Sequence, residues 1–508
     1  MNLLKAKISG IARGVIVFIA LVLQVATMFI ISSALQQYAT VAYLFIEMLS
    51  VILAFRLAND YKEYKEFWLV IVIVLPVFGY FMYFMWGRTS VNRGINRRLR
   101  KAEEDAAKMM KQDHDAMNEL KRLHPNKVQI SRYLAGQGYP IYRNTYVKYF
   151  PIGDELLRSL IEDLRKAEKF ILLEYFIISA GEIWNEVEKI LFDKAANGVE
   201  VRLIMDDFGC LLLNDNDFKQ NLKEHNIKFK TFGPIHQEVT RFSFNFRDHR
   251  KIAVIDGNVG YTGGVNLADE YANIIDRFGH WKDSGVRLEG EGVWSFTCFF
   301  MEMWEAISKK TEDYSPYKPT VTVKALGFVQ PYSGGPHKVN SNTSASAYTH
   351  IINKAREYLY ITTPYLVLDN LMREDIISAA NSGVDVRIIT PKRYDKWYVH
   401  MVTIFNYGYL LKNGVKIYEY SKGFIHAKNV ITDDECGICG TINMDYRSLY
   451  LHYECGVVIT DNPSVLDMKK DFLSTLKVSE KITYERWLHR PLRHKLVQFI
   501  LKILSPML

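Results

Sequence analysis

Cysteine is scarce in this chain of 508 residues. The cysteines are Cys210, Cys298, Cys436, Cys439 and Cys455. Because the set is sparse and odd in number, it argues against a fold built on disulfides. Cys436 and Cys439 have the spacing of redox and zinc motifs. No second pair at zinc spacing lies nearby, so chance explains this pair better.

Charge is nearly absent from two long stretches near the N-terminus. Residues 14–55 contain one charged residue, Glu47, and residues 67–87 contain none. A single helix over the first stretch would rise roughly 60 Å, about twice a bilayer core, so we expect it to fold back near Gln36. The second stretch is long enough to span once. Residues 1–88 are therefore predicted to form a membrane anchor of two to three hydrophobic helices, too long for a cleaved signal peptide.

The sequence leaves open how many times this anchor crosses the membrane. Glu47 would be costly in lipid, so it either contacts a neighbouring helix or marks a partly re-entrant segment. Basic residues flank the anchor at Lys5, Lys7, Arg13, Arg88, Arg93, Arg97, Arg98, Arg100 and Lys101. The group after the anchor is larger, so we expect the rest of the chain in the cytoplasm. Two spans with a re-entrant loop would place both groups on that side.

Composition excludes a disordered chain, because 49% of the residues are hydrophobic and 13% aromatic. The length is too great for one core, so two or more units are expected. A net charge of +8 is a mild excess that suits anionic partners such as acidic lipid or nucleic acid.

Beyond a charged helical linker predicted at 89–145, strand-like and helix-like segments alternate, which is typical of an α/β sheet covered by helices. The pattern is duplicated: "KAEKFILLEYF" at 166 resembles "KAREYLYITTPY" at 354, and "NGVEVRLI" at 197 resembles "SGVDVRII" at 382. We therefore predict two α/β/α sandwich units, 146–315 and 316–508, facing each other around a pseudo-two-fold axis.

Each unit carries the same polar motif with the same spacing, H-x-K-x4-D-x6-G-[GT]-x-N. The motif residues are His249, Lys251, Asp256 and Asn266 in the first copy, and His426, Lys428, Asp433 and Asn443 in the second. A single H-x-K occurs often by chance. Two copies that match at every position, inside a duplicated unit, do not.

This residue set fits phosphoryl chemistry. Residues two apart in a strand share a face, so each His and Lys point the same way, and the two copies can converge on one pocket. Lys and Asn donate hydrogen bonds to phosphate oxygens, one His can attack phosphorus, and the other can serve as acid and base. Asp256 and Asp433 complete the motif in the catalytic set, but their odd spacing from His indicates scaffolding. No metal or other cofactor is required.

The duplicated motif resembles the phospholipase D superfamily, and from about residue 67 to the C-terminus the chain resembles bacterial cardiolipin synthases. The segments that carry the resemblance are "FWLVIVIVLPVFGYFMYFMWGR", "GGVNLADEY", "WKDSGVRLEG", "TTPYLV", "GVKIYEYSKGFIHAK" and "NMDYRSLYLHYE". The resemblance implies a cell-membrane enzyme that converts two phosphatidylglycerol molecules into cardiolipin and glycerol through a phosphohistidine. It also implies that Asp283 and Glu454 hydrogen-bond and orient the catalytic His, unless they are plain surface carboxylates.

Two further features accompany the resemblance. His452 stands where the family usually has Asn, and Thr441 where it often has Ser. At the C-terminus Leu488, Leu492, Leu496, Phe499, Ile503 and Met507 share a helical face among basic residues. This amphipathic helix is predicted to lie on anionic membrane lipid, with docking on the protein's own surface as the alternative.

Several functions stay open at this point. The nearest alternative is a phospholipase D-type hydrolase, or a transferase that uses another alcohol. A nuclease or phosphatidylserine synthase needs no such N-terminus, so no nucleic-acid partner is expected, and a non-catalytic scaffold needs no paired His. A homo-oligomer is possible. The symmetry of the motif does not say which His is the nucleophile.

Overall fold

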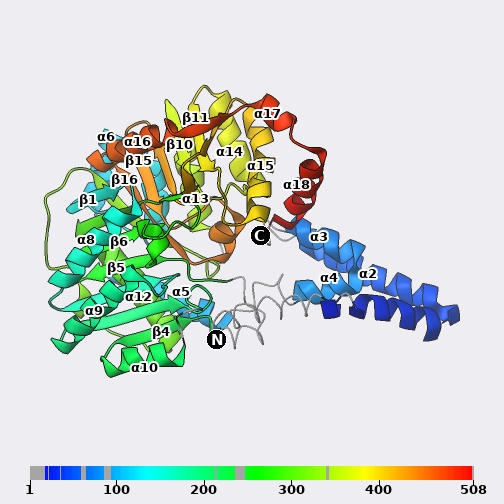
Figure 1. Ribbon diagram of the computed structural model, residues 1–508, viewed down its shortest axis with the longest axis horizontal. Helices are drawn as coiled ribbons and strands as arrows, with labels where there is room; N and C mark the ends of the chain where they lie inside the picture. Colours follow the sequence, from blue (N-terminus) through cyan, green and yellow to red (C-terminus); the bar gives the residue numbers. More distant parts are fainter. Residues whose placement is uncertain are drawn as a thin grey trace.

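The computed structural model describes residues 18–20, 22–34, 36–58, 65–84, 93–211, 213, 215–234, 246–338 and 342–505. The flanking residues Lys5, Lys7, Arg13 and Arg88, and the predicted apolar position Met507, lie outside these ranges. Figure 1 shows an α/β body from which the N-terminal helices project as an arm.

In the described residues the first unit contains a seven-stranded mixed sheet in the order β1-β8-β6-β5-β2-β3-β4. The strands in that order are Thr145–Phe150, Gly285–Gly290, Val259–Gly263, Lys251–Ile255, Phe170–Tyr175, Glu200–Asp206 and Lys228–Phe232. Strands β2, β3 and β4 are parallel, whereas β5 runs antiparallel to β2. Each residue of β2 and β5 is buried, which explains why both read as continuous apolar runs.

The second unit repeats this order, with one strand added at the edge. In the described ranges its sheet has eight strands, β17-β12-β11-β10-β14-β15-β16-β9. In that order they are Ser479–Ile482, Lys416–Tyr420, Asp385–Pro391, Tyr358–Thr362, Asn429–Thr432, Cys436–Gly440, Glu454–Thr460 and Phe328–Gly334. The matching order from β2 to β8 and from β10 to β16 confirms the predicted fold class of two duplicated α/β units.

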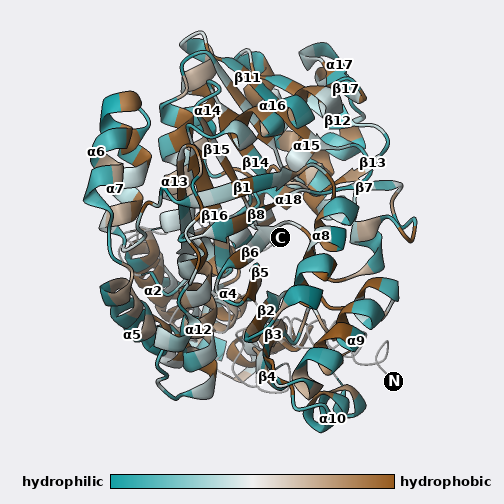
Figure 2. Cartoon of the chain, turned by 90° about the vertical axis from the view of Figure 1, so that its left-hand side faces the viewer, coloured by the Kyte–Doolittle hydropathy of each residue, from teal (hydrophilic) through white to brown (hydrophobic). Residues whose placement is uncertain are grey.

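Helices cover the outer faces of the sheets, and Figure 2 shows apolar strands inside and polar helix surfaces outside. They are α8 Gly153–Lys166, α9 Glu182–Ala196, α10 Asn216–Glu224, α12 Val293–Ser308, α13 Thr343–Asn353, α14 Asn370–Asn381, α15 Trp397–Lys412 and α16 Pro463–Leu476. Helices α17 (Tyr484–Leu488) and α18 (Leu492–Leu504) pack on α15 instead. Side-chain caps fix several starts. Asp369, for example, accepts a hydrogen bond from the Met372 backbone N–H at the start of α14.

Short strands of the two units also pair with each other. Strand β7 (His280–Lys282) of the first unit pairs with β13 (Gly423–Ile425) of the second, directly before His426. On the opposite side of the axis, Asp248 bridges to Tyr453, and the His249 N–H donates to the Tyr453 carbonyl oxygen (2.9 Å). These pairings bring the two motifs together.

The region predicted as a linker packs closely on the body. It forms α5 (Arg93–Met109), α6 (His114–Leu123) and α7 (Val128–Gly136), and buries Ala106 and Leu120. The Lys127 ammonium forms a buried ion pair with Asp433 (2.5 Å). The helices therefore add to the core rather than separating the arm from it.

The projecting arm differs in part from the prediction. Helical residues 18–20 and 22–34 lie beside α2 (Ala39–Ala58), the Tyr43 hydroxyl donates to the Met28 carbonyl oxygen (2.6 Å), and the chain reverses at Gln36–Tyr38 as expected. Glu47 is exposed on α2 and makes no hydrogen bond or ion pair with a described residue. Of the described helices, one is long and apolar enough to cross a membrane, Gln36–Ala58.

The second uncharged stretch does not form one helix. It forms α3 (Lys65–Val74) and α4 (Pro76–Met82), separated at Leu75, because proline lacks an N–H and its ring breaks a continuous helix. The two pack so closely that a Cβ on Gly79 would lie 2.6 Å from the Ile71 carbonyl oxygen. Ten residues rise about 15 Å, half a bilayer core, so neither helix would span alone.

Candidate active site

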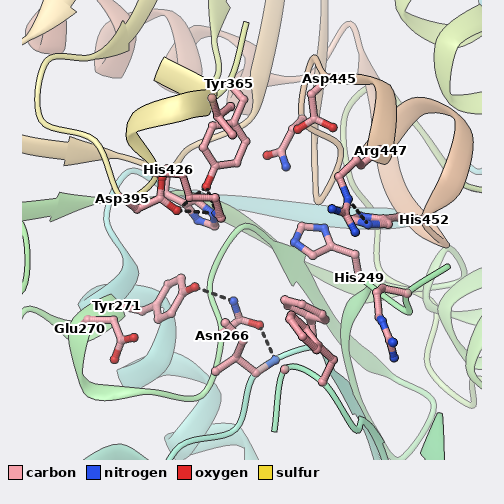
Figure 3. Close-up of a pocket in the computed structure, with 18 of the residues that line it drawn as sticks. His249, Asn266, Glu270, Tyr271, Tyr365, Asp395, His426, Asp445, Arg447 and His452 are labelled. Carbon is pink, nitrogen blue, oxygen red and sulfur yellow. Dashed lines mark hydrogen bonds and ion pairs between the residues drawn. The ribbon is translucent and has the colours of Figure 1, made fainter. Parts of the chain in front are cut away.

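The two motif histidines lie in one cavity of about 490 Å³ between the units (Figure 3). His249 lies two residues before β5 and His426 three residues before β14, so each lies where its sheet meets the other unit. Both side chains are more than nine-tenths buried. The cavity is lined from both units, as the sequence predicts.

Each histidine is held by a carboxyl group from the opposite unit. His249 Nδ1 lies 2.9 Å from Glu454 Oε1 and 3.0 Å from Oε2, and His426 Nδ1 lies 2.6 Å from Asp283 Oδ2. Glu454 and Asp283 are fully buried, so neither is a surface carboxylate. The Nδ1 contacts leave Nε2 of both rings for substrate, and the exchange of partners means that neither unit holds a complete site alone.

Burial controls the protonation of both rings. Burial, and then the charge of Lys428, lower the pKa of His426 to about 4, although Asp283 opposes this shift. Burial, followed by Lys251 and His452, lowers the pKa of His249 well below its ordinary value. Both imidazoles are therefore neutral near pH 7 before an anion enters, which suits a nucleophile.

The two carboxyl groups differ in protonation. Burial raises the pKa of Glu454 to about 8, even though Lys251 and a hydrogen bond from Thr441 favour its ionised form. Burial also acts on Asp283, but His426, Lys428 and the Ser284 N–H more than offset it, so its pKa lies below the ordinary value. Near pH 7, Glu454 is a carboxylic acid and Asp283 is a carboxylate.

The lysines and asparagines of the motif lie around these rings. The Lys251 ammonium donates to the His249 carbonyl oxygen (2.6 Å), and Lys428 donates likewise to the carbonyl of His426. Both lysines are buried behind the histidines and do not line the cavity, but each ammonium has three donors. Asn266 and Asn443 line the cavity.

The two motif aspartates do not line the cavity. The Asp256 carboxylate accepts hydrogen bonds from the backbone N–H groups of Glu168 (2.9 Å), Lys169 (2.7 Å) and Phe170 (2.9 Å). Asp433 accepts in the same way from residues 356–358. Both have a positive φ. They join the end of one strand to the start of its neighbour, as their spacing from His indicates.

We expect Asp256→Ala to lower the free energy of unfolding by about 1–2 kcal/mol, because the backbone N–H groups of residues 168–170 lose their shared acceptor. Denaturant titration measures this. Asp256→Asn is the matched control: it keeps an acceptor oxygen and tolerates positive φ, so it should lose less. Lost activity with unchanged stability would instead assign Asp256 a part in proton transfer.

Several cavity residues were not singled out as site residues from the sequence. Glu270 and Tyr271 lie on the His426 side with Asp395, and Arg447 lies near His249 (Figure 3). Glu270, Tyr271 and Arg447 belong to "GGVNLADEY" and "NMDYRSLYLHYE", so the segments that carried the family resemblance already contained this signal. Asp395 follows a strand with no such motif, and nothing in the sequence marks it.

Comparison with known proteins assigns the chain to a family. A family profile described as "Cardiolipin synthase, PLD-like domain" matches residues 160–275 and 348–476, one segment in each unit. A cardiolipin synthase of Geobacillus kaustophilus is 33% identical over 417 residues, which cover 80% of this chain and 82% of the relative. The chain belongs to the cardiolipin synthase family. The resemblance inferred from its motifs is thereby confirmed, and the chain is an enzyme of the phospholipase D type.

Other matches agree with the family. A cardiolipin synthase of Listeria welshimeri is 34% identical over 377 residues, covering 74% of this chain and 78% of the relative. An uncharacterized protein of Streptococcus mutans is 43% identical over 402 residues, covering 78% and 86%. A profile named for the phospholipase D-nuclease N-terminus matches 48–88. The structure of phosphatidylserine synthase from Haemophilus influenzae has a TM-score of 0.58 at 15% identity, covering 75% of this chain and 100% of that one, which supports the fold alone.

Proposed function

We propose that this cardiolipin synthase-family enzyme transfers a phosphatidyl group from one phosphatidylglycerol to another, giving cardiolipin and glycerol through a phosphohistidine. The observation that carries the proposal is the pair of neutral histidines in one cavity, each held at Nδ1 by a carboxyl group of the other unit. Acid–base pairs of this kind serve covalent transfer, in which one ring attacks and the other handles the leaving proton.

In the proposed reaction Nε2 of one histidine attacks the donor phosphorus, and the bond from phosphorus to the glycerol oxygen breaks. The second histidine protonates that oxygen and glycerol leaves. The hydroxyl of a second phosphatidylglycerol then gives its proton to the same ring and attacks phosphorus, and the bond to the first histidine breaks. Lys251, Lys428, Asn266 and Asn443 would donate to the phosphate oxygens as negative charge develops.

We expect kcat/KM to be highest between about pH 4 and pH 7. Below about pH 4, His426 is protonated and its ring cannot attack or accept a proton. Burial lowers the pKa of Lys251 to about 7 and that of Lys428 to about 8, so both lose positive charge as the pH rises through these values. Initial rates over this range measure both limbs. An acid limb at the ordinary His pKa of 6.5 would contradict the account.

Hydrolysis by water is the alternative outcome at the phosphohistidine. The test is to incubate the purified full-length chain with phosphatidylglycerol in vesicles and to resolve lipids and glycerol. Transfer predicts one glycerol released for each cardiolipin formed. Phosphatidic acid as the main product would establish the hydrolase instead, and neither product would refute both.

The projecting arm and helix α18 support action at a membrane. In α18, Leu492, Leu496 and Phe499 are 81%, 63% and 59% exposed, whereas Gln498 on the opposite face is buried. The helix therefore docks on α15 by one face and leaves its apolar face open, beside α3 of the arm (Figure 1). We infer that residues 1–88 anchor the chain with two or more passes, that 89–145 connects the anchor to cytoplasmic units 146–315 and 316–508, and that α18 lies on anionic lipid.

Leu496→Asp with Phe499→Asp is expected to lower activity on phosphatidylglycerol vesicles about tenfold, because two apolar side chains lose their contact with lipid. Activity on dispersed short-chain phosphatidylglycerol should be unchanged. Leu466→Asp is a matched control, since Leu466 is 53% exposed on α16, away from the arm. An equal fall with both substrates would indicate that α18 supports the fold instead.

A further inference from the structure

Each motif histidine is also held through its backbone by the opposite unit. The His249 N–H donates to the Tyr453 carbonyl oxygen (2.9 Å), and the His426 N–H donates to the Lys282 carbonyl oxygen (2.7 Å). Tyr453 and Lys282 come directly before the carboxyl groups that contact Nδ1 of the same two rings. One short segment of the opposite unit therefore holds each histidine at two points, the backbone N–H and the ring.

Tyr453 is itself held at both its backbone and its side chain. Its N–H donates to the Arg247 carbonyl oxygen (2.9 Å), so it pairs with the segment that carries His249. The side chain is buried and does not line the cavity. Its hydroxyl donates to Asn96 Oδ1, and its ring stacks on that of His337 with the ring centres 5.6 Å apart. The residue that holds His249 is therefore fixed to groups outside the cavity.

Helix α5 supplies this support along one face. Asn96, Arg100 and Glu103 are four and three residues apart, a spacing that puts them on the same face of a helix. Arg100 donates to the His337 carbonyl oxygen (3.1 Å). The Glu103 carboxylate lies 2.8 Å from Nε2 of the same residue. Three polar side chains of α5 therefore converge on Tyr453 and on the residue that stacks against it.

The His426 side has the same arrangement with a different anchor. Lys282 occupies the position of Tyr453 in the matching segments "HWKDSGV" and "LHYECGV". Its ammonium lies 2.8 Å from Asp471 Oδ1 on α16, and the Tyr149 hydroxyl donates to the same carboxylate (2.8 Å). Helix α16 belongs to the second unit, so this anchor lies in the body rather than on α5. Equivalent positions thus hold the two histidines, although their side chains bind different partners.

We propose that Tyr453 and Lys282 are positioning residues for the two motif histidines, and that Asn96 of α5 acts on His249 through the Tyr453 hydroxyl. The inference rests on the proposed transfer, which supplies the reaction to be measured. A ring that attacks phosphorus or moves a proton loses rate steeply when it is displaced by about 1 Å. The helix that follows the membrane arm in the chain is therefore part of the support of the active site.

The Tyr453 hydroxyl separates positioning from packing. Phenylalanine at this position would fill the same space, and it would keep the stack on His337 and the backbone bonds to residues 247 and 249. A buried hydroxyl loses water on folding, and its bond to Asn96 largely offsets that loss, so the bond adds little net stability. It does fix the direction of the side chain. Tyr453→Phe therefore removes the orientation with little change in volume.

Tyr453→Phe and Asn96→Ala are each expected to lower kcat for cardiolipin formation about tenfold, with KM for phosphatidylglycerol within about twofold of wild type. Both changes break the same bond, so the double variant should match the worse single variant instead of showing the product of the two effects. Asn96→Asp keeps an acceptor oxygen and should recover part of the loss. Initial rates of the full-length chain in mixed micelles of phosphatidylglycerol measure these values.

Tyr358→Phe is the matched control. The Tyr358 hydroxyl also donates to a side chain, at Asp434 Oδ1 (2.9 Å), but Tyr358 lies at the start of β10 and does not line the cavity. Thermal unfolding should show a similar small loss of stability in both Phe variants, whereas kcat should fall only in Tyr453→Phe. On the other side of the cavity, Lys282→Met should also lower kcat, because it removes the ammonium and keeps the stem of the side chain.

A lower unfolding temperature with unchanged kcat in Tyr453→Phe would make Tyr453 a packing residue and overturn the proposal. Additive effects of Tyr453→Phe and Asn96→Ala would overturn the part played by α5. Phosphatidic acid formed by the wild-type chain in place of cardiolipin would refute the transfer alone, and the same variants would then be compared by their rates of hydrolysis. A wild-type chain with neither activity would refute both.

Discussion

Cardiolipin formation is expected to fall by at least about 10⁴-fold when either His249 or His426 is replaced by alanine. One variant lacks the nucleophile and the other the acid and base, so neither completes a turnover with phosphatidylglycerol. The double variant should be no worse than either single one, since residues that act as a unit are not additive. Lipid analysis of the purified variants in vesicles measures this.

His489→Ala is the control for this prediction, because His489 lies on the surface after α17. It should leave the rate unchanged. Circular dichroism should match among all variants. Cardiolipin made at an appreciable rate by either active-site variant would contradict a shared site of two histidines.

Asp283→Asn is expected to lower kcat about 10³- to 10⁴-fold, and Glu454→Gln only about tenfold. Asp283 is ionised and accepts Nδ1–H of His426, so an asparagine amide that donates to Nδ1 imposes the wrong tautomer. Glu454 is protonated and already a donor to His249, and Gln keeps that donor while its oxygen still accepts from Thr441. The kcat values of this matched pair measure the difference. Equal losses would show that both carboxyl groups are in the same protonation state.

The motif spacing predicted a good part of the site. His249 lies before β5 and lines the cavity, whereas Lys251 begins the strand and lies outside the lining. Asp256 follows the other end of β5, where it braces the backbone. The motif spacing could not predict that each histidine contacts a carboxyl group of the other unit. These contacts depend on β7 pairing with β13 across the two units, and sequence spacing carries no information on contacts between units.

Other differences have local causes. The uncharged stretch 67–87 has the length of a span, yet Pro76 divides it and Gly79 permits a close backbone approach. The linker helices are rich in charge, and their apolar residues on one face dock them on the body. Glu270 and Arg447 occupy the same position after the motif Asn in the two copies and differ in charge. The motif spacing alone does not predict that both side chains line the cavity.

The central claim is that the two copies of the motif form one active site, which works through a covalent intermediate on a histidine. Its most direct test is a rapid quench of the full-length enzyme during turnover of phosphate-labelled phosphatidylglycerol, followed by mapping of the label. The account predicts an acid-labile phosphatidyl adduct on one motif histidine, at no more than one per chain. Cardiolipin formed with no labelled histidine at any time would contradict it.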